Sequence, residues 1–391
     1  MKALAPHHEA LRAAAHAEPL GLYLHVPFCV DRCTYCSFTA TRDLERKGAF
    51  LDRLEAEARA WGEALGHPAV DTLYVGGGTP SVLEAPELAR LRASLASAFD
   101  LRPLEEATLE ANPGSATPTW MAAVRACGFD RLSLGVQSLD DAVLALLGRR
   151  HDAATALKAA RDARRAGFRR LSADLILGVP GQRPAAALED AARLVEAGCS
   201  HLSLYLLDLD KACPLKAQVA RGEVELPDEE AVAAAFEGLQ EGLPRLGLFP
   251  YEISNHAVPG EESRHNLRYW ERRPYLGLGP GAASQLARWR WTESASVAAW
   301  TDGRGTPELE ELDAAEALAE IPLLVLRMHA GVDWEALRAR AAAQGLASRV
   351  EGWEAQLRPF LQAGLLLREG PRLRLSPRGM LLSNAILQTF V

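Results

Sequence analysis

The 391-residue chain has few cysteines, no long hydrophobic run and no excess of basic charge. Six cysteines are too few for a disulfide scaffold, which excludes the small disulfide-rich secreted proteins. No apolar run reaches the roughly 18–20 residues that a membrane-spanning helix needs, so we expect no transmembrane segment. Lysine and arginine total 43 against 51 acidic residues, which gives a formal net charge of −8. This balance argues against a general nucleic-acid binder, because phosphate binding needs a basic face.

Residues 1–19 do not resemble a secretory signal, because polar residues interrupt each apolar stretch. The interrupting residues are His7, His8, Glu9, Arg12, His16 and Glu18. We therefore expect an N-terminal tail over residues 1–19 and a cytoplasmic location, with peripheral membrane association left open. In a reducing cytoplasm, clustered thiols hold a metal more often than they form disulfides.

From residue 20 onward, short β-type segments alternate with longer amphipathic segments. The predicted strands are Leu22–Val26, Thr72–Val75, Ala107–Ala111, Arg131–Val136, Leu171–Leu177 and His201–Leu207. The predicted helices are Phe50–Leu65, Ala85–Ala98, Thr119–Cys127, Ala153–Ala166 and Ala185–Ala197. This alternation predicts an α/β fold of parallel strands, a partial (β/α)6 barrel over residues 20–255, with ligands at the C-terminal strand ends. A doubly wound open sheet is the structural alternative.

The pattern changes near residue 255. A predicted helix, Asp228–Leu246, and a predicted short strand, Tyr251–Ser254, precede the change. We expect residues 256–391 to form a connector, loop-rich over 259–281, and then a mainly helical C-terminal domain. A hairpin of Leu365–Leu367 and Leu373–Leu375 suggests that this domain is winged-helix-like, with a purely structural lid as the alternative.

Three cysteines crowd into eight positions directly after the first predicted strand: Cys29, Cys33 and Cys36. Their Cys-xxx-Cys-xx-Cys spacing can hold three irons of a 4Fe–4S cluster and leaves the fourth iron open to a ligand. Structural zinc is the alternative, but such a site needs four closed ligands. His25 could be the fourth only from within the strand itself, which is an awkward geometry.

The cysteine motif, with Tyr35 just before its last cysteine, resembles the radical S-adenosylmethionine (SAM) superfamily. Other segments resemble the oxygen-independent coproporphyrinogen III oxidase-like branch of that superfamily. They are Gly76-Gly77-Gly78-Thr79-Pro80, Glu110-Ala-Asn-Pro-Gly114, Leu-Gly-Val-Gln137-Ser, Leu-Gly-Arg149-Arg-His and Asp174-Leu-Ile-Leu-Gly-Val-Pro-Gly-Gln182. The resemblance covers nearly the whole chain. It implies a radical SAM barrel in which SAM chelates the open iron.

Several of these residues also suit a SAM pocket on chemical grounds. A turn of bare glycine backbone lets a ligand approach closely and offers N–H groups. Asp174 lies in an apolar strand, where a carboxylate without a partner is costly. Arg149 could pair with the SAM carboxylate, although a solvated helix surface is the simpler interpretation of that residue alone. The resemblance implies the full set of SAM contacts: Tyr23, Gly77, Gly78, Thr79, Glu110, Gln137, Arg149 and Asp174.

Two functions occur in this branch, a coproporphyrinogen III oxidase and a haem chaperone. The oxidase motif extends to a fourth cysteine, at the position of Phe38 here, and the oxidase has a longer N-terminal segment. The chaperone has a His-Asn-x-x-Tyr-Trp motif after the barrel, which is similar to His265-Asn-Leu-Arg-Tyr269-Trp270. Histidine can ligate haem iron and aromatic rings offer flat apolar surface, so His265, Tyr269 and Trp270 are the candidate haem site. A satisfied structural histidine is the alternative for His265.

The resemblance therefore favours a haem-binding chaperone that carries a 4Fe–4S cluster, binds SAM and delivers haem to an unidentified acceptor protein. The alternative is a radical SAM enzyme that oxidatively decarboxylates two propionates of coproporphyrinogen III.

Overall fold

The structure, a computed structural model, describes residues 7–391. Six parallel strands form the centre of a 12-stranded sheet with the order β12-β11-β10-β9-β1-β2-β3-β4-β5-β6-β8-β7. The six are β1 (Leu20–Val26), β2 (Val70–Gly77), β3 (Glu106–Ala111), β4 (Arg131–Gln137), β5 (Arg170–Leu177) and β6 (His201–Leu206). Strands β1 and β6 pair with β9 and β8 and not with each other, so the barrel stays open. The predicted partial (β/α)6 barrel is confirmed. The alternative, a doubly wound open sheet, is wrong.

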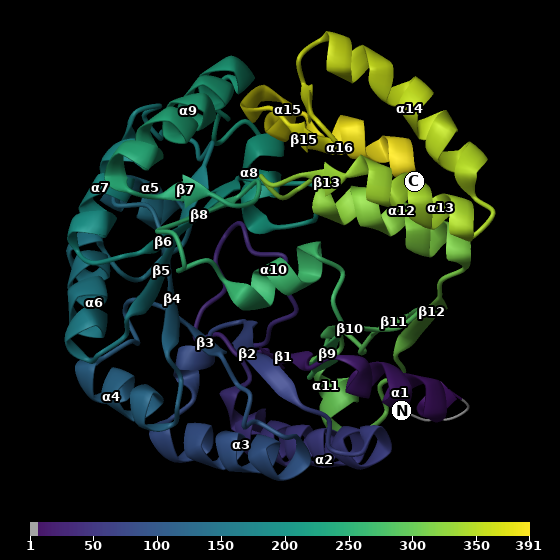
Figure 1. Cartoon of the computed structure of the whole chain (residues 1–391). Coiled ribbons are helices and arrows are strands. Elements are labelled where there is room, and N and C mark those ends of the chain that lie inside the picture. Colours follow the sequence, from purple (N-terminus) through teal and green to yellow (C-terminus); the bar gives the residue numbers. More distant parts are fainter. Residues whose placement is uncertain (1–6) are drawn as a thin grey trace.

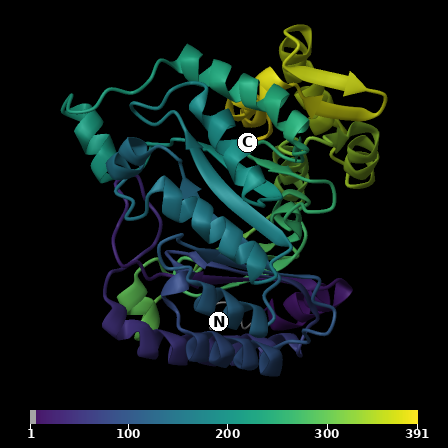
Figure 2. The same cartoon turned by 90° about the vertical axis from the view of Figure 1, so that its left-hand side faces the viewer.

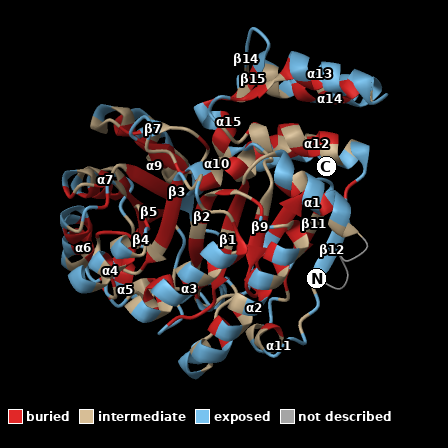
Figure 3. Ribbon diagram, turned by 60° about the horizontal axis from the view of Figure 1, so that its bottom comes forward, coloured by how far each residue is buried: buried red, intermediate tan, exposed pale blue. Residues whose placement is uncertain are grey.

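Helices cover the outer face of this curved sheet (Figure 1). They are α2 (Lys47–Leu65), α3 (Ala85–Ala98), α4 (Pro118–Ala126), α6 (Ala153–Arg165), α7 (Ala186–Glu196) and α9 (Glu229–Gly242). The short helices α5 (Asp141–Leu146) and α8 (Pro214–Ala220) instead share a second, smaller apolar cluster that includes Val143 and Leu215. Short 3-10 turns lie at Leu44–Arg46, Pro80–Val82 and Leu243–Leu246. The helices are red on their sheet side and pale blue outside in Figure 3, as amphipathic periodicity predicts.

The strands alternate between apolar and polar residues, and the alternation positions the site. In β2, Leu73 and Val75 are fully buried in the main hydrophobic core, whereas Thr72 and Tyr74 point to the other face. The same alternation in β3 and β5 brings Glu110 and Asp174 to the inner face. The interior of the partial barrel is therefore lined with polar side chains from consecutive strands.

The segment after residue 255 is more regular than the expected loop-rich connector. The additional elements are β7 (Phe249–Pro250), β8 (Asn255–Ala257), α10 (Arg264–Trp270), β9 (Tyr275–Leu278), β10 (Ala283–Leu286), β11 (Trp289–Thr292), α11 (Val297–Thr301) and β12 (Glu308–Glu311). The predicted strand at Tyr251–Ser254 is wrong, because these residues form the turn between β7 and β8. Strand β9 runs parallel to β1, so the barrel sheet continues past the predicted boundary.

Helix α10 lies inside the crescent of strands (Figure 1). Its first N–H groups point at the buried carboxylate of Glu106 in β3, which accepts from Arg264 N (3.1 Å) and His265 N (3.0 Å). A carboxylate at a helix N-terminus is favourable, because it meets unpaired N–H groups and the positive end of the helix dipole. This contact fixes the helix that carries the candidate haem residues.

The C-terminal region packs at one side of the barrel (Figure 2). It contains α12 (Ala314–Val325), β13 (Val332–Asp333), α13 (Trp334–Ala343), α14 (Ala347–Gln362), β14 (Leu366–Glu369), β15 (Arg372–Leu375), α15 (Pro377–Leu381), α16 (Ser383–Leu387) and a 3-10 turn at Gln388–Phe390. Strands β13, β15 and β14 form a three-stranded sheet that includes the predicted hairpin.

At the other end of the chain, residues 1–6 of the expected tail lie outside the described residues, and α1 (His8–Ala17) is a helix with Leu11 and Ala15 buried. Within residues 7–391, no helix is long and apolar enough to cross a membrane.

Candidate functional site

The loop after β1 carries the three clustered cysteines and is tied to a neighbouring element. The Thr34 N–H donates to the carbonyl of Leu147 just after α5 (3.1 Å). Cys29 is buried, and Cys33 and Cys36 are half-buried. The loop therefore presents three thiols from one anchored segment at the C-terminal end of the first strand.

Hydrogen-bond donors reach two of the three sulfur atoms. The Thr79 hydroxyl donates to Cys29 Sγ (3.6 Å), and Arg149 Nη1 donates to Cys33 Sγ (3.3 Å). Such donors favour the thiolate over the thiol. Burial has the opposite effect and raises the pKa of the Cys29 and Cys36 thiols. This donor set fits a positively charged iron–sulfur group, which would stabilise three thiolates at once.

The zinc alternative lacks a fourth ligand. Among the described residues, no group of three or more His, Cys, Asp or Glu side chains converges where it could hold one metal ion. His25 uses both ring nitrogens, because Nε2 donates to the Thr39 carbonyl (2.8 Å) and Nδ1 accepts from the Tyr23 hydroxyl (3.0 Å). A cluster distributes its ligands over separate irons, so the three thiols fit a 4Fe–4S group better than one zinc ion.

The N–H groups of the glycine turn after β2 are not free, contrary to expectation, while the prediction that Gly77, Gly78 and Thr79 contact SAM stays a prediction. Gly77 N–H donates to Glu110 Oε2 (3.1 Å), and the N–H groups of Gly78 and Thr79 donate to main-chain carbonyls at and just beyond the end of β1 (2.8 Å each). Gly77 has φ +112°, and a Cβ there would lie 2.6 Å from the His25 ring. The bare backbone at this position is therefore required by close packing within the protein itself.

Glu110 is held by two donors at the end of β3. The Tyr74 hydroxyl donates to Oε1 (2.7 Å) and Gly77 N–H donates to Oε2 (3.1 Å). Burial raises the pKa of Glu110 to about 7; the negative charge of Asp174 adds to this effect and the Tyr74 hydrogen bond opposes it. A carboxyl group that titrates near neutral pH can accept an ammonium group once it is ionised.

The other predicted SAM residues lie on neighbouring strands. Asp174 in β5 accepts from the Ser133 hydroxyl (3.4 Å), and burial raises the pKa of Asp174 to about 6. Arg149 does not lie on a solvated helix surface, because its half-buried guanidinium donates to a β4 carbonyl (2.6 Å) as well as to Cys33. Gln137 ends β4 with φ +73°, a strained conformation for a non-glycine residue that is common at functional sites.

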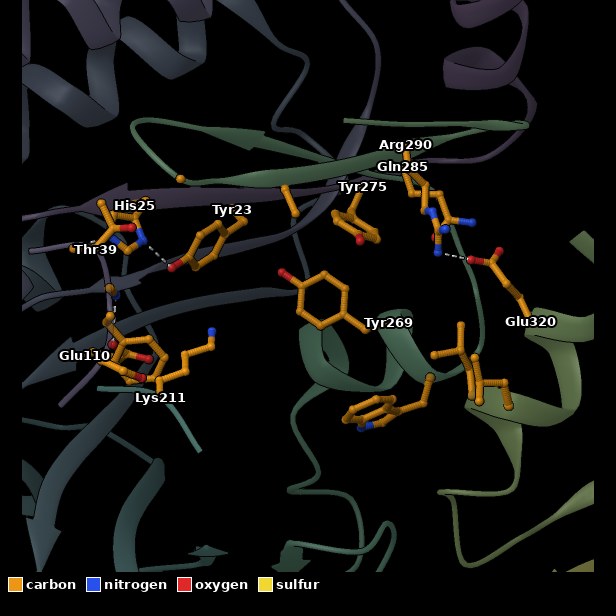
Figure 4. A pocket seen from close by; sticks show the side chains of 18 residues that line it. Tyr23, His25, Thr39, Glu110, Lys211, Tyr269, Tyr275, Gln285, Arg290 and Glu320 are labelled. Atoms are coloured by element: carbon orange, nitrogen blue, oxygen red, sulfur yellow. Dashed lines mark hydrogen bonds and ion pairs between the residues drawn. The ribbon is translucent and has the colours of Figure 1, made fainter. Parts of the chain in front are cut away.

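A cavity of about 700 Å³ extends from these strand ends across the barrel interior. Its lining residues are Tyr23, His25, Ser37, Phe38, Thr39, Gly77, Glu110, Lys211, Tyr269, Trp270, Tyr275, Gly281, Ala283, Gln285, Arg290, Glu320, Leu323 and Leu324. Figure 4 shows Glu110 and Lys211 at one end, Arg290 and Glu320 at the other, and Tyr269 between them. The volume lies within the range of small-molecule and cofactor sites, about 300–1,000 Å³.

His265 lies behind the cavity wall and not on it. The ring is fully buried, with Nδ1 3.0 Å from Thr72 Oγ1 and Nε2 2.7 Å from the Tyr269 hydroxyl oxygen. Burial, with a smaller contribution from the positive charge of Arg268, lowers the pKa of His265 to about 3. Both nitrogens are in use, so we revise the prediction that this histidine ligates haem iron. In this arrangement it orients Tyr269, which lines the cavity together with Trp270.

Several residues in and around this cavity were not predicted from the sequence. Tyr74, which donates to the cavity residue Glu110, pairs in register with Tyr23, so the period-2 alternation of β2 was a usable signal for its inward position. Arg290 and Glu320 had no such signal, because they come from a strand and a helix that the sequence analysis left outside the barrel.

Comparisons with known proteins agree with this geometry. A family model of the Radical SAM superfamily matches residues 23–195, and a model of the HemN C-terminal domain matches residues 312–382. The chain is 37% identical over 383 residues to the "Heme chaperone HemW" of Mycobacterium tuberculosis, which covers 96% of this chain and 95% of that protein. The chain belongs to the HemN-like family of radical SAM proteins. For this family, the implied cofactors are a 4Fe–4S cluster and SAM.

Two further relatives support the family and the fold. The chain is 34% identical to the "Radical S-adenosyl methionine domain-containing protein 1, mitochondrial" of Mus musculus, over 95% of this chain and 87% of that protein. The solved coproporphyrinogen III oxidase (HemN) of Escherichia coli superposes with a TM-score of 0.84 and covers 98% of this chain and 93% of that chain. Its sequence identity is 22%, so this likeness shows the radical SAM fold alone.

Proposed function

We propose that this chain is a haem-binding chaperone of the radical SAM family, with its cluster on Cys29, Cys33 and Cys36. The observation that carries the proposal is one continuous cavity. It joins Ser37, Phe38 and Thr39 of the cysteine loop to aromatic rings on α10 and β9. Similarity to the heme chaperones, over nearly the whole chain, supports haem as the occupant of the aromatic part.

The strand-end part of the cavity suits SAM, which when bound would supply radical chemistry after its sulfonium accepts one electron from the reduced iron–sulfur cluster. Tyr23, Gly77 and Glu110 line this part. Glu110 would accept a hydrogen bond from the methionyl amino group, and the negative charge of Asp174 lies near Glu110. Arg149, which donates to Cys33 Sγ, would bring positive charge close to the SAM carboxylate. Gln137, Gly78 and Thr79 complete the proposed set.

The opposite part of the cavity suits a flat apolar molecule. The Tyr269 and Tyr275 rings meet edge to face with centroids 4.6 Å apart, and Trp270 lies beside them in the wall. Phe38 is 66% exposed although it lines the cavity, which is unusual for a large apolar ring. Phe38 stands where the oxidase motif has its fourth cysteine, so this position offers an apolar surface. An apolar surface here favours haem binding over porphyrinogen decarboxylation.

Replacing Trp270 with alanine is expected to weaken haem binding about ten-fold, because it removes flat apolar contact area worth roughly 1–2 kcal/mol. Trp270→Phe retains an aromatic ring and should bind haem nearly as well as the wild type. The measurement is an absorbance titration of the reconstituted protein with haem. Equal affinity of the wild type and both variants would place haem elsewhere.

We further infer a cytoplasmic location and delivery of haem to an acceptor protein. All six cysteines, which lie within the described residues, are free, and this agrees with a reducing compartment. Oxygen-sensitive thiolate–iron chemistry is also best protected there. Pull-down of haem-dependent proteins with the haem-loaded chaperone, compared with the haem-free form, would test the delivery step.

A further inference from the structure

We propose that Arg290 is the carboxylate-binding residue of the cavity and that Glu320, its ion-pair partner, competes with the ligand for it. The inference rests on the proposed function, because it assigns the ligand a flat apolar body with a carboxylate at its edge. Both residues line the cavity at the end opposite the cysteine loop (Figure 4). Among the described lining residues, the side chains with a permanent positive charge are those of Arg290 and Lys211. Lys211 lies at the other end of the cavity beside Glu110, so Arg290 is the cation at this end.

The present partners of Arg290 can be exchanged. Its Nε and Nη2 donate to Glu310 Oε2 (3.2 and 2.6 Å), and its Nη1 pairs with Glu320 Oε1. The Glu310 side chain is 56% exposed, so that pair contributes little to stability. The pair with Glu320 is the one inside the cavity, because the Glu320 side chain is only 8% exposed.

Glu320 would not lose all its partners if a ligand displaced it. Arg272 Nε already donates to Glu320 Oε2 (2.6 Å). Arg272 Nη2 is buried and has no hydrogen-bond partner among the described residues. A planar guanidinium fork matches a carboxylate with two parallel bonds, so Arg272 can take both oxygens of Glu320. Arg290 Nη1 would then be free for a ligand carboxylate. The buried Glu320 carboxylate would keep Arg272 as its partner, so no buried charge would be left unpaired.

The surroundings define the rest of the ligand. Leu323 and Leu324, on the same helix as Glu320, give this end of the cavity an apolar part. Gln285 lies beside Arg290 on the neighbouring strand and pairs in register with Tyr275. Apolar walls with one charged donor fit the edge of a porphyrin that carries propionates. They do not fit a phosphate or a free metal ion, which would need several polar contacts.

The test compares haem with haem dimethyl ester, which has the same ring and iron but no carboxylates. The wild type should bind haem about ten-fold more tightly than the ester, because a hydrogen bond to a charged group is lost with the ester. Arg290→Met keeps chain length without charge and should bind both ligands equally. Glu320→Gln removes the internal competitor and should bind haem several-fold more tightly. Arg288→Met is the matched control, since Arg288 pairs with Glu311 and does not line the cavity.

The outcomes separate this inference from the proposed function. Failure of the wild type to bind haem at all would overturn the proposed function and this inference with it. Haem binding with no preference over the ester, or with the same preference in Arg290→Met, would overturn the inference alone. Thermal melting identifies a misfolded Arg290→Met variant, and in that case Glu320→Gln decides: unchanged or weaker haem binding would overturn the inference.

Discussion

Replacing any one of Cys29, Cys33 and Cys36 with alanine is expected to abolish the brown iron–sulfur chromophore of the anaerobically reconstituted protein. The three thiols come from one anchored loop, so each variant removes one of the three proposed ligands. A cluster held by three protein ligands cannot lose one without losing its iron. Loss of the cluster is measured by the absorbance of its sulfur-to-iron charge-transfer band and by the iron content per chain.

Cys127→Ala is the control for this series. Cys127 follows α4 on the outer side of the barrel, far from the loop in sequence, and packs partly buried against the hydrophobic core. This variant should keep the full iron content. Stoichiometric zinc without iron in the wild type after anaerobic reconstitution would contradict the cluster assignment.

Replacing Glu110 with glutamine should weaken SAM binding about ten- to a hundred-fold while the cluster stays intact. The reason is that a hydrogen bond to a charged group contributes roughly 1.5–3 kcal/mol, and the neutral amide of glutamine replaces the charged carboxylate that would accept from the methionyl amino group. The measurement is the SAM-induced change in the cluster's electron paramagnetic resonance spectrum. Glu105→Gln, five residues earlier and exposed, is the matched control and should leave SAM affinity unchanged.

The same carboxyl group predicts a pH dependence of SAM binding. Burial raises the pKa of Glu110 to about 7, so the group is largely neutral below that pH and ionised above it. SAM affinity of the wild type should therefore rise between about pH 6 and 7.5, below the range in which the α-amino group of free SAM itself loses a proton. Glu110→Gln has no such group and should show a flat profile in that interval. A wild-type profile that falls with rising pH in that interval would show that Glu110 does not face the methionyl amino group.

The barrel could be predicted because its signals are local. Each strand and each outer helix has its own periodicity, and the cysteine spacing lies within one short loop. The pairing of β9 with β1 could not be predicted, because it joins segments some 250 residues apart through only a few backbone hydrogen bonds. Four-residue strands such as β9 and β10 also carry too little periodicity to stand out in a Gly- and Pro-rich stretch.

The sequence allowed us to predict which residue types the site contains, but not which residues they contact. Glu110 was expected from its position at a strand end, whereas its bonds to Tyr74 and Gly77 depend on the register in which β2 and β3 pair. The role of His265 changed because its partners, Thr72 and Tyr269, come from β2 and from its own helix. The role of a histidine in such a motif can be assigned only when its hydrogen-bond partners are known.

The most direct test of the account uses one anaerobically reconstituted sample for two assays. Haem is titrated by absorbance, and coproporphyrinogen III is then supplied with SAM and a reductant while the decarboxylated product is measured. The account predicts stoichiometric haem binding and no decarboxylation, because Phe38 and the aromatic end of the cavity provide a haem surface in place of the oxidase cysteine. Robust decarboxylation without haem binding would contradict it.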